Sequence, residues 1–337
     1  MGRSRACFKH AANSEHKHEH PHTCLLVVPT RLAVYGGVRF GLTTPIVTLN
    51  PRVHAAWEET AGVDALRQIA QAADRLGYHH LTCSDHVAIP AAVTATRGSR
   101  YYDPFATLGF LAAMTERIKL VTHVLVLPYH HPLELAKRLG TLDQLSAGRI
   151  VAGLGVGSLR EEFELLGVDF NARGARYEDS LQALRAALGH RQPAYSGSHF
   201  AFRDFVVDPC AVQAHMPIWL GGRTPRSLRR ALKFADGWDP FGFTHAQLES
   251  LLERARQWPE WRRRAEPIDL IFAPEPPIDV STPDRVAAAI DTVARYQLIG
   301  ATVLTLRFSS RSRADFVDQL DVFASKVAPR FAVRLSS

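Results

Sequence analysis

The sequence predicts a single (β/α)8 barrel, and three observations support this fold class. From residue 38 onward, short strand-forming runs alternate with amphipathic helical stretches, which is the pattern of βα units around a parallel sheet. Eight such units can be counted, and eight parallel strands close into a barrel with a filled interior. The length of 337 residues suits one barrel with insertions, so no second domain is required.

The first four units carry clear periodicity and start signals. In the first helix, Leu66, Ile69 and Ala73 recur at helical spacing and form one apolar face. Asp103 followed by Pro104 is typical of a helix N-terminus, because aspartate caps the first turn and proline fits it. We expect strands at 38–43, 79–84, 118–125 and 149–155, and helices at 62–76, from 104, at 132–145 and at 175–188.

The last four units have shorter strands, and a hairpin is expected across residues 195–207 before they begin. A doubly wound open sheet is the structural alternative, but its phosphate-binding first turn is rich in glycine. The corresponding turn here, residues 43–50, contains no glycine, which favours the barrel. We expect strands at 217–221, 237–240, 268–272 and 301–306, and helices at 225–234, from about 244, at 283–296 and at 314–327.

The composition is that of a soluble globular protein, with 46% hydrophobic and 22% charged residues. No run approaches the roughly 18 apolar residues of a membrane helix, so we expect a cytoplasmic protein with no membrane partner.

The formal net charge is +7, but no dense basic run is present, so nucleic acid is a poor candidate partner. The four cysteines lack CxxC spacing, which argues against a zinc ribbon or a disulfide framework. Cys83 lies in an apolar strand, where an inert buried thiol is expected.

Residues 1–37 differ from the rest of the chain, because they show no periodicity and hold five of the sixteen histidines. Alternating histidines can bind metal in a flexible tail. The alternative, which we favour, is an N-terminal extension that is disordered or non-native. The barrel domain is therefore expected to span residues 38–337.

In a barrel the functional residues gather at the carboxyl ends of the strands. Asp85 and His86 directly follow the second strand, and a carboxylate beside an imidazole can fix its tautomer or raise its pKa. The pair could thus act as an acid–base unit. Alternatively, Asp85 caps a loop and His86 is merely solvated, and the sequence does not decide between these readings. Asp239 and Arg307 also stand at strand ends.

Glycine is dense at the ends of strands four and five, within residues 153–157 and 221–222, where Arg223 follows. Backbone N–H groups there can approach a ligand closely, and the helix after each cluster favours an anion such as phosphate. Tight packing at the barrel rim explains either cluster equally well. The GxGxxG pattern of a dinucleotide site fails, because Ser158 or Arg160 stands where the third glycine is needed. The strand ends supply no converging set of histidines and carboxylates, so no metal site is expected.

A set of short motifs occurs in order along the chain from Val38 onward. They are Ser84-Asp85-His86, Asp103-Pro104-Phe105, Thr122-His123-Val124, LDQLSAGR at 142–149, Gly155-Val156-Gly157 with Glu162-Phe163, and PIWLGG at 217–222. Together they resemble the bacterial luciferase-like family of flavin- and deazaflavin-dependent oxidoreductases. No single motif is diagnostic, but the set is specific.

The resemblance implies a cofactor ring that lies across the mouth of the barrel. Asp85 and His86 would lie near this ring, with His86 as the candidate proton donor. In this family the third strand often holds a non-prolyl cis peptide behind the ring, which here would join His123 and Val124. The cofactor-binding residues that the resemblance implies are Asp85, Thr122, His123, Val124, Gly155, Gly157, Ser158, Gly221, Gly222 and Arg223.

The most similar branch uses coenzyme F420, a deazaflavin with a phosphate and an acidic tail, which implies hydride transfer to or from a small organic substrate. This chain departs from that branch at Ser158, where dehydrogenases of the family carry an acidic residue, and at 88–90, where they carry a tryptophan. Two alternatives follow: a reduced-FMN-dependent monooxygenase that uses O2, and a non-catalytic barrel that binds flavin or deazaflavin. Relatives commonly form dimers, so a homodimer is a further expectation of the resemblance.

Overall fold

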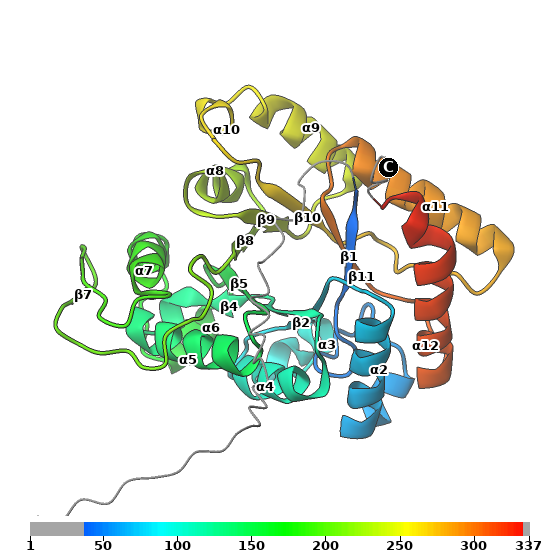
Figure 1. The fold of residues 1–337 in the computed structure, drawn as a ribbon, viewed down its shortest axis with the longest axis horizontal. Helices are drawn as coiled ribbons and strands as arrows, with labels where there is room; N and C mark the ends of the chain where they lie inside the picture. The colour runs from blue at the N-terminus through cyan, green and yellow to red at the C-terminus, as the bar shows by residue number, and fades with distance from the viewer. Residues whose placement is uncertain (1–36, 333–337) are drawn as a thin grey trace, which may run out of the picture. The chain divides into compact units, whose positions relative to one another are not determined.

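The computed structural model describes residues 37–332 and contains a closed barrel of parallel strands (Figure 1). The last strand pairs in parallel with the first, from Arg39 against Val303 to Leu42 against Leu306, and this pairing closes the barrel. The predicted (β/α)8 fold is therefore confirmed, whereas the predicted N-terminal extension lies outside the described residues. In barrel order the strands are β1 (Arg39–Leu42), β2 (His80–Cys83), β3 (Lys119–Thr122) with its continuation β4 (Leu125–Val126), β5 (Ile150–Gly155), β8 (Ile218–Gly222), β9 (Gly237–Pro240), β10 (Asp269–Phe272) and β11 (Val303–Leu306).

Helices surround the strands on the outside (Figure 1). The expected N-terminal cap of the second unit is present, because the Asp103 carboxylate accepts a hydrogen bond from the backbone N–H of Ala106. The main helices are α2 (Val63–Arg75), α4 (Pro104–Met114), α5 (Pro132–Leu145), α7 (Arg173–Ala187), α8 (Pro225–Phe234), α9 (His245–Ala255), α11 (Pro283–Leu298) and α12 (Arg313–Val322). Shorter helical segments in the loops are α1 (Trp57–Thr60), η1 (Ala91–Val93), α3 (Thr94–Arg97), η2 (Leu127–Tyr129), α6 (Arg160–Leu165) and α10 (Pro259–Arg262).

Three of the expected elements take a different form in the structure, and the short loop helices, among them α6, are additional to the prediction. The expected third strand, 118–125, is interrupted at His123 and Val124, so that it forms β3 and β4. The expected hairpin is shorter, with β6 (Tyr195–Ser196) antiparallel to β7 (Ala201–Phe202). The expected last helix ends as an α-helix at Val322 and continues as a wider helical turn, η3 (Phe323–Val327). Local periodicity could not show these interruptions, because they depend on contacts with distant segments.

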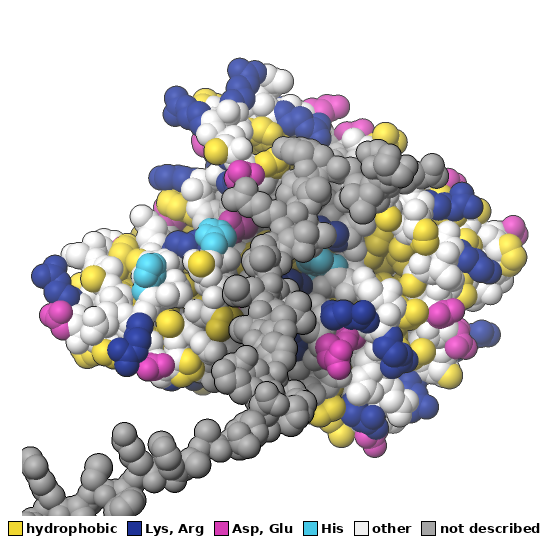
Figure 2. Space-filling view, in the orientation of Figure 1, with side chains coloured by type: hydrophobic (Ala, Val, Ile, Leu, Met, Phe, Trp, Pro, Cys, Tyr) yellow, Lys and Arg dark blue, Asp and Glu magenta, His cyan; other side chains and the backbone are white. Residues whose placement is uncertain are grey.

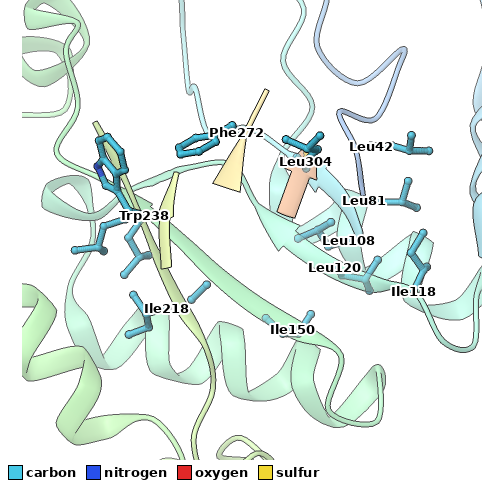
Figure 3. Packing of buried hydrophobic residues seen from close by; sticks show 14 of the residues in the cluster. Leu42, Leu81, Leu108, Ile118, Leu120, Ile150, Ile218, Trp238, Phe272 and Leu304 are labelled. Carbon is cyan, nitrogen blue, oxygen red and sulfur yellow. The ribbon is translucent and has the colours of Figure 1, made fainter. Parts of the chain in front are cut away.

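Alternation along the strands separates an inner from an outer apolar layer. Outward-facing side chains pack against the helices in one large core, which includes Leu42, Leu81, Leu120, Ile150 and Leu304 (Figure 3). Inward-facing side chains form a second, smaller cluster inside the barrel, made of Val121, Val151, Trp219, Ile271 and Val303. Cys83 belongs to the outer layer, and burial raises the pKa of its thiol to about 12, which agrees with the predicted inert role.

Two histidines occupy the amino-terminal half of the barrel interior. His80 is fully buried, with its Nε2 3.1 Å from the Thr305 hydroxyl and its Nδ1 3.0 Å from Nδ1 of His79. The ring of His79 stacks on Trp219 at a centroid distance of 6.1 Å. A Cβ on Gly41 would lie 2.0 Å from the His80 ring, so this position must be glycine. Burial lowers the pKa of both imidazoles, that of His79 to about 3, and the pair is neutral at physiological pH.

The same alternation decides which residues line the carboxyl-terminal mouth of the barrel. Two positions beyond the inward-facing Val121 and Trp219 lie His123 and Gly221. The same alternation of side chains along each strand turns three further residues toward the mouth. They are Gly155 of β5, Asp239 of β9 and Arg307 after β11.

Val124 explains why the mouth needs glycines on β5 and β8. The peptide bond between His123 and Val124 is cis, as predicted, and the Val124 side chain projects over the neighbouring strands. A Cβ on Gly155 would lie 2.5 Å from Val124 Cγ2, and one on Gly221 would lie 3.1 Å from Val124 Cγ1. Packing of the rim therefore accounts for both glycines before any ligand is considered.

Two further glycines have reasons within the fold. Gly157 has φ +82°, and a Cβ there would lie 2.6 Å from the Phe163 ring. A Cβ on Gly222 would lie 2.4 Å from Cβ of Ser227, at the start of α8. The glycine clusters thus let the loops after β5 and β8 pass close to their helices.

Positively and negatively charged side chains are interspersed on the described surface shown in Figure 2, and neither sign forms a large patch there. Within the described residues, no helix combines the length and the apolar character that crossing a lipid bilayer requires.

We expect Gly155→Ala to destabilise the protein by about 1–3 kcal/mol, because the added methyl group must displace Val124. Val124→Ala removes the obstructing methyl groups, so the double variant should lose less stability than the two single variants together. Urea unfolding of the four proteins measures this coupling. Gly174→Ala is the control, since a Cβ there meets nothing within 4 Å; strictly additive losses at 124 and 155 would contradict the packing argument.

We expect the free energy of unfolding to fall as the pH drops from 6.5 toward 3. The unfolded chain takes up protons on His79 and His80 below about 6.5, whereas burial prevents uptake in the folded protein. The loss approaches about 1.4 kcal/mol per pH unit for each histidine. Denaturant unfolding between pH 5 and 6.5 should show a shallower slope for His79→Gln than for the parent. The exposed His190→Gln should keep the parent slope, and an unchanged slope in the His79 variant would count against the buried neutral pair.

Candidate active site

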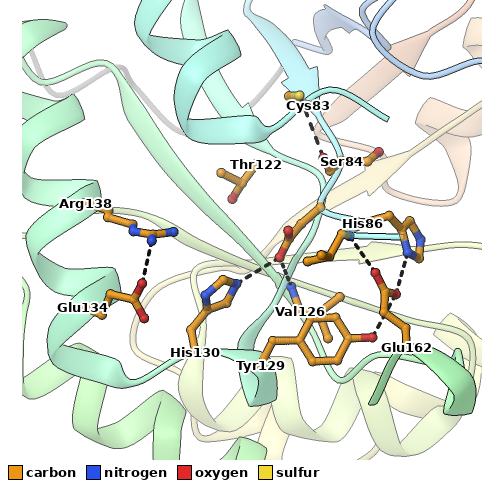
Figure 4. A network of polar contacts seen from close by, with 12 residues as sticks. Cys83, Ser84, His86, Thr122, Val126, Tyr129, His130, Glu134, Arg138 and Glu162 are labelled. Carbon is orange, nitrogen blue, oxygen red and sulfur yellow. Dashed lines mark hydrogen bonds and ion pairs between the residues drawn. The ribbon is translucent and has the colours of Figure 1, made fainter. Parts of the chain in front are cut away.

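Asp85 and His86 follow β2, but the structure gives them different partners instead of pairing them. The Asp85 carboxylate is buried, accepts a hydrogen bond from the backbone N–H of Val126 at 3.0 Å and lies 3.1 Å from Nε2 of His130 (Figure 4). Asp85 therefore ties the loop after β2 to the segment that follows the cis peptide. The expected contact between Asp85 and His86 is not formed, because alternating side chains point to opposite sides of the chain.

The partner of His86 is Glu162 of α6. Nδ1 of His86 lies 2.8 Å from Oε2 of Glu162, and the hydroxyl of Tyr129 donates to the same oxygen at 3.0 Å (Figure 4). The backbone N–H groups of Val87 and Ala88 donate to Oε1 at 2.6 and 3.3 Å. The Glu162 side chain has no exposed surface, so this carboxylate is satisfied entirely by protein donors.

These donors decide the charge of Glu162. Burial opposes ionisation, but the hydrogen bonds and charge from His86, with those from Tyr129 and Val87, hold the pKa of Glu162 below its ordinary value. The same environment raises the pKa of the Tyr129 phenol, first through burial and then through the Glu162 charge, so Tyr129 stays a donor. Glu162 is therefore an anion at neutral pH.

An anionic Glu162 fixes the tautomer of His86. Nδ1 of the imidazole carries the proton and donates a hydrogen bond to the carboxylate. Nε2 is then free to accept or release a proton. The imidazole packs edge-on against the ring of Tyr101 at a centroid distance of 4.6 Å, and 19% of its side chain is exposed. His86 and Glu162 together have the arrangement of a general acid–base pair.

A second imidazole–carboxylate contact lies at the mouth. Nε2 of His123 is 2.9 Å from Oδ2 of Asp239, which is buried. Burial lowers the pKa of His123, but the charge of Asp239 and its contact outweigh this effect, so the pKa is raised overall. Although the two atoms are close, the imidazole is not oriented to form a hydrogen bond with this oxygen. Oδ2 of Asp239 therefore has no hydrogen-bond donor among residues 37–332.

The predicted cofactor-binding residues divide into those at the mouth and those away from its surface. Val124 is partly exposed between Gly155 and Gly221, and Ser158 and Arg223 are exposed in the loops after β5 and β8. Gly157 and Gly222 lie in the same two loops and are partly exposed. Thr122 is fully buried, and its hydroxyl bonds both backbone groups of Gly153 at 2.8 and 2.9 Å. The structure therefore does not bring the Thr122 side chain to the mouth.

The residues at the mouth fit a flat heteroaromatic ring. Val124 offers an apolar face flanked by two glycines. The buried Oδ2 of Asp239 could accept a hydrogen bond from a ring N–H. The exposed Arg223 precedes the N-terminus of α8, a suitable place for a phosphate. Within residues 37–332, no three histidine, cysteine or acidic side chains are grouped to hold a metal ion.

In the sequence, Asp239 and Arg307 stand out only as strand-end residues, and Glu162 only as part of a motif. Glu161, Glu162 and Glu164 all lie in α6, and only Glu162 is buried. One short helix with three glutamates gives no periodic signal for the inward-facing one. Tyr101 and Tyr129 carried no signal, because both reach the site from loops.

Comparison with known proteins agrees with the fold and the motifs. The family model described as "Luciferase-like monooxygenase" matches residues 39–318. An uncharacterized protein of Mycobacterium tuberculosis is 31% identical over 182 residues, which span 50% of this chain and 64% of that protein. The phthiodiolone/phenolphthiodiolone dimycocerosates ketoreductase of Mycobacterium bovis is 29% identical over 215 residues, or 61% of this chain and 56% of that enzyme. The alignments thus span less than two thirds of the length of both relatives.

Solved structures share the fold at low sequence identity. The monooxygenase RslO1 from Streptomyces bottropensis matches with a TM-score of 0.70 at 22% identity, over 88% of this chain and 100% of that one. The coenzyme F420 dependent tetrahydromethanopterin reductase from Methanopyrus kandleri matches with a TM-score of 0.63 at 17% identity, with the same coverage. Since the family model covers most of the chain and the resemblance seen in the motifs is confirmed, this chain belongs to the luciferase-like monooxygenase family.

Proposed function

We propose that this protein is an oxidoreductase that uses coenzyme F420 to move a hydride to or from a small organic substrate. The observation that carries the proposal is the pairing of His86 with the buried anion of Glu162 at the mouth of the barrel. Reduction of a carbonyl group needs a hydride at carbon and a proton at oxygen, and this pair can supply the proton. The similarity to a ketoreductase supports the same chemistry.

The role of each residue follows from the hydrogen bonds. Nε2 of His86 gives a proton to the substrate oxygen in reduction and takes one from the hydroxyl group in oxidation. Glu162 keeps Nδ1 protonated and stabilises the positive charge that His86 carries when both nitrogens are protonated. Tyr129 and the backbone N–H of Val87 keep Glu162 ionised, which maintains this function near neutral pH.

The deazaflavin, when bound, would supply the hydride or accept it. Val124, with Gly155 and Gly221 beside it, would support the ring, and His123 with Asp239 would face its polar edge. Ser158, Gly157, Gly222 and Arg223 in the loops after β5 and β8 would hold the phosphate end, aided by the N-terminus of α8.

Equilibrium binding of oxidised F420 and of oxidised FMN to the full chain tests the cofactor assignment. We expect F420 to bind more tightly, because its acidic tail adds contacts with positive charge near Arg223 that FMN lacks. Tight binding of FMN with no binding of F420 would instead favour an O2-using monooxygenase. Binding of F420 without turnover across alcohols, aldehydes and ketones would favour a non-catalytic barrel.

We expect His86→Ala and Glu162→Gln to lower turnover by about 10²-fold or more while cofactor affinity stays within about twofold. The alanine variant removes the proton donor, and the neutral amide of the glutamine variant cannot stabilise a charged imidazole. Steady-state kinetics and cofactor titration measure the two effects. Glu161→Gln is the matched control, because Glu161 neighbours Glu162 in α6 but is exposed. Unchanged turnover in His86→Ala would remove His86 from the reaction.

A further inference from the structure

Arg307 directs a positive charge into the mouth of the barrel. Val303 belongs to the inner apolar cluster and Thr305 contacts the interior His80, so alternation turns the Arg307 side chain inward as well. The backbone there is fixed, because the Arg307 carbonyl oxygen accepts a hydrogen bond from the N–H of Ile278 at 2.8 Å. The guanidinium group thus starts from a rigid position at the end of β11.

This guanidinium has no partner among residues 37–332, either as a hydrogen bond or as an ion pair. Burial lowers its pKa, and the charges of Glu58, Glu275 and Tyr101 act in the opposite direction without cancelling this effect. Glu58 already accepts from the backbone N–H groups of Ile46 and Ala55, each at 2.9 Å. An arginine has five N–H donors, and a partly buried arginine that uses none of them within the described part of the chain is unusual.

Arg149 is a buried arginine with a purely structural role, and it serves as a comparison for Arg307. Arg149 is buried, and its guanidinium donates to the carbonyl oxygens of Ser146 and Ala112 at 2.7 and 2.8 Å. It also donates to the Thr115 hydroxyl at 2.8 Å. Among the described residues Arg307 makes no contact of this kind, so stabilisation of the described barrel does not explain it.

Arg307 lies on the same side of the mouth as His86. β1 pairs with both β11 and β2, and His86 follows β2. Burial raises the pKa of Tyr101, which packs against His86, and the charges of Arg97 and Arg307 act against this increase. The charge of Arg307 also opposes protonation of His123. The Tyr101 hydroxyl donates to the carbonyl oxygen of Arg97 at 2.7 Å, and the Arg97 side chain likewise has no partner among the described residues.

The opposite side of the mouth carries the loops that we assign to the cofactor phosphate. β5 and β8 lie across the barrel from β11, β1 and β2 in the strand order. A negative group bound at Arg307 would therefore lie beside His86 and away from Arg223.

We propose that Arg307, with Arg97 on the same side of the mouth, binds a carboxylate or phosphate group of the substrate, so that the protein acts on an organic anion. This inference rests on the proposed function and specifies its substrate class. The same groups could instead hold an acidic part of the cofactor, and the experiment separates the two sources.

The experiment compares phenylpyruvate with phenylacetone, in which a methyl group replaces the carboxylate. Calorimetric titration of the full chain, with and without oxidised cofactor, gives the affinity for each probe and for inorganic phosphate. We expect phenylpyruvate to bind at least about tenfold more tightly than phenylacetone, since a charge-assisted contact contributes this much. Arg307→Gln should abolish the preference, and Arg307→Lys should retain part of it because the charge remains.

Arg313→Gln, an exposed arginine at the start of α12, is the control and should leave the preference unchanged. The proposal is overturned if neither phenylpyruvate nor phosphate binds, or if Arg307→Gln keeps the preference. It is also overturned if Arg307→Gln weakens F420 or FMN binding tenfold and leaves the probes unaffected, which would assign Arg307 to the cofactor. Binding of FMN alone would refute the proposed cofactor, yet the preference at Arg307 would still be measured independently.

Discussion

The buried carboxylate of Glu162 is the interaction on which the candidate active site depends. Its two oxygens accept from the imidazole of His86, the phenol of Tyr129 and the backbone of the loop after β2. These donors come from two segments of the mouth, the loop after β2 and the turn η2 that holds Tyr129, so one charge on α6 fixes their relative positions. Removal of that charge would leave several donors without an acceptor in a dry environment, which is costly.

Buried carboxylates that hold loops recur elsewhere in this barrel. Asp74 at the end of α2 accepts from the backbone N–H groups of residues 116–118, before β3. Asp179 of α7 accepts from the backbone of residues 198–200 in the hairpin loop. Asp179 also accepts from the Tyr195 hydroxyl at 2.8 Å, and burial together with Asp179 raises the pKa of this phenol to about 12. None of these donors changes its protonation near neutral pH, so both anchors are structural. Glu162 differs from Asp74 and Asp179 because one of its donors is the partly exposed imidazole of His86, which couples the anchoring of the loop to proton transfer.

The mouth has two chemically distinct sides around Val124. Over β5 and β8 the chain offers glycines, exposed Ser158 and Arg223, and the start of a helix. Over β11, β1 and β2 it offers His86 and Arg307, whose guanidinium has no partner among residues 37–332. A long ligand with an anionic end suits the first side, and a small molecule that exchanges a proton suits the second. The proposed function uses this division, with the cofactor phosphate on the first side and the substrate on the second.

Periodicity and start signals in the sequence determined the number and order of the strands and helices, because these depend on neighbours within a few residues. The motifs likewise located the cis bond between His123 and Val124 and placed His86 at the mouth. Only the tertiary structure decided that His86 pairs with Glu162 and Asp85 with His130, that Thr122 is buried, and that Gly155 makes room for Val124. These contacts join segments tens of residues apart, and their geometry is set by the closure of the barrel, for which no local pattern in the chain carries a signal.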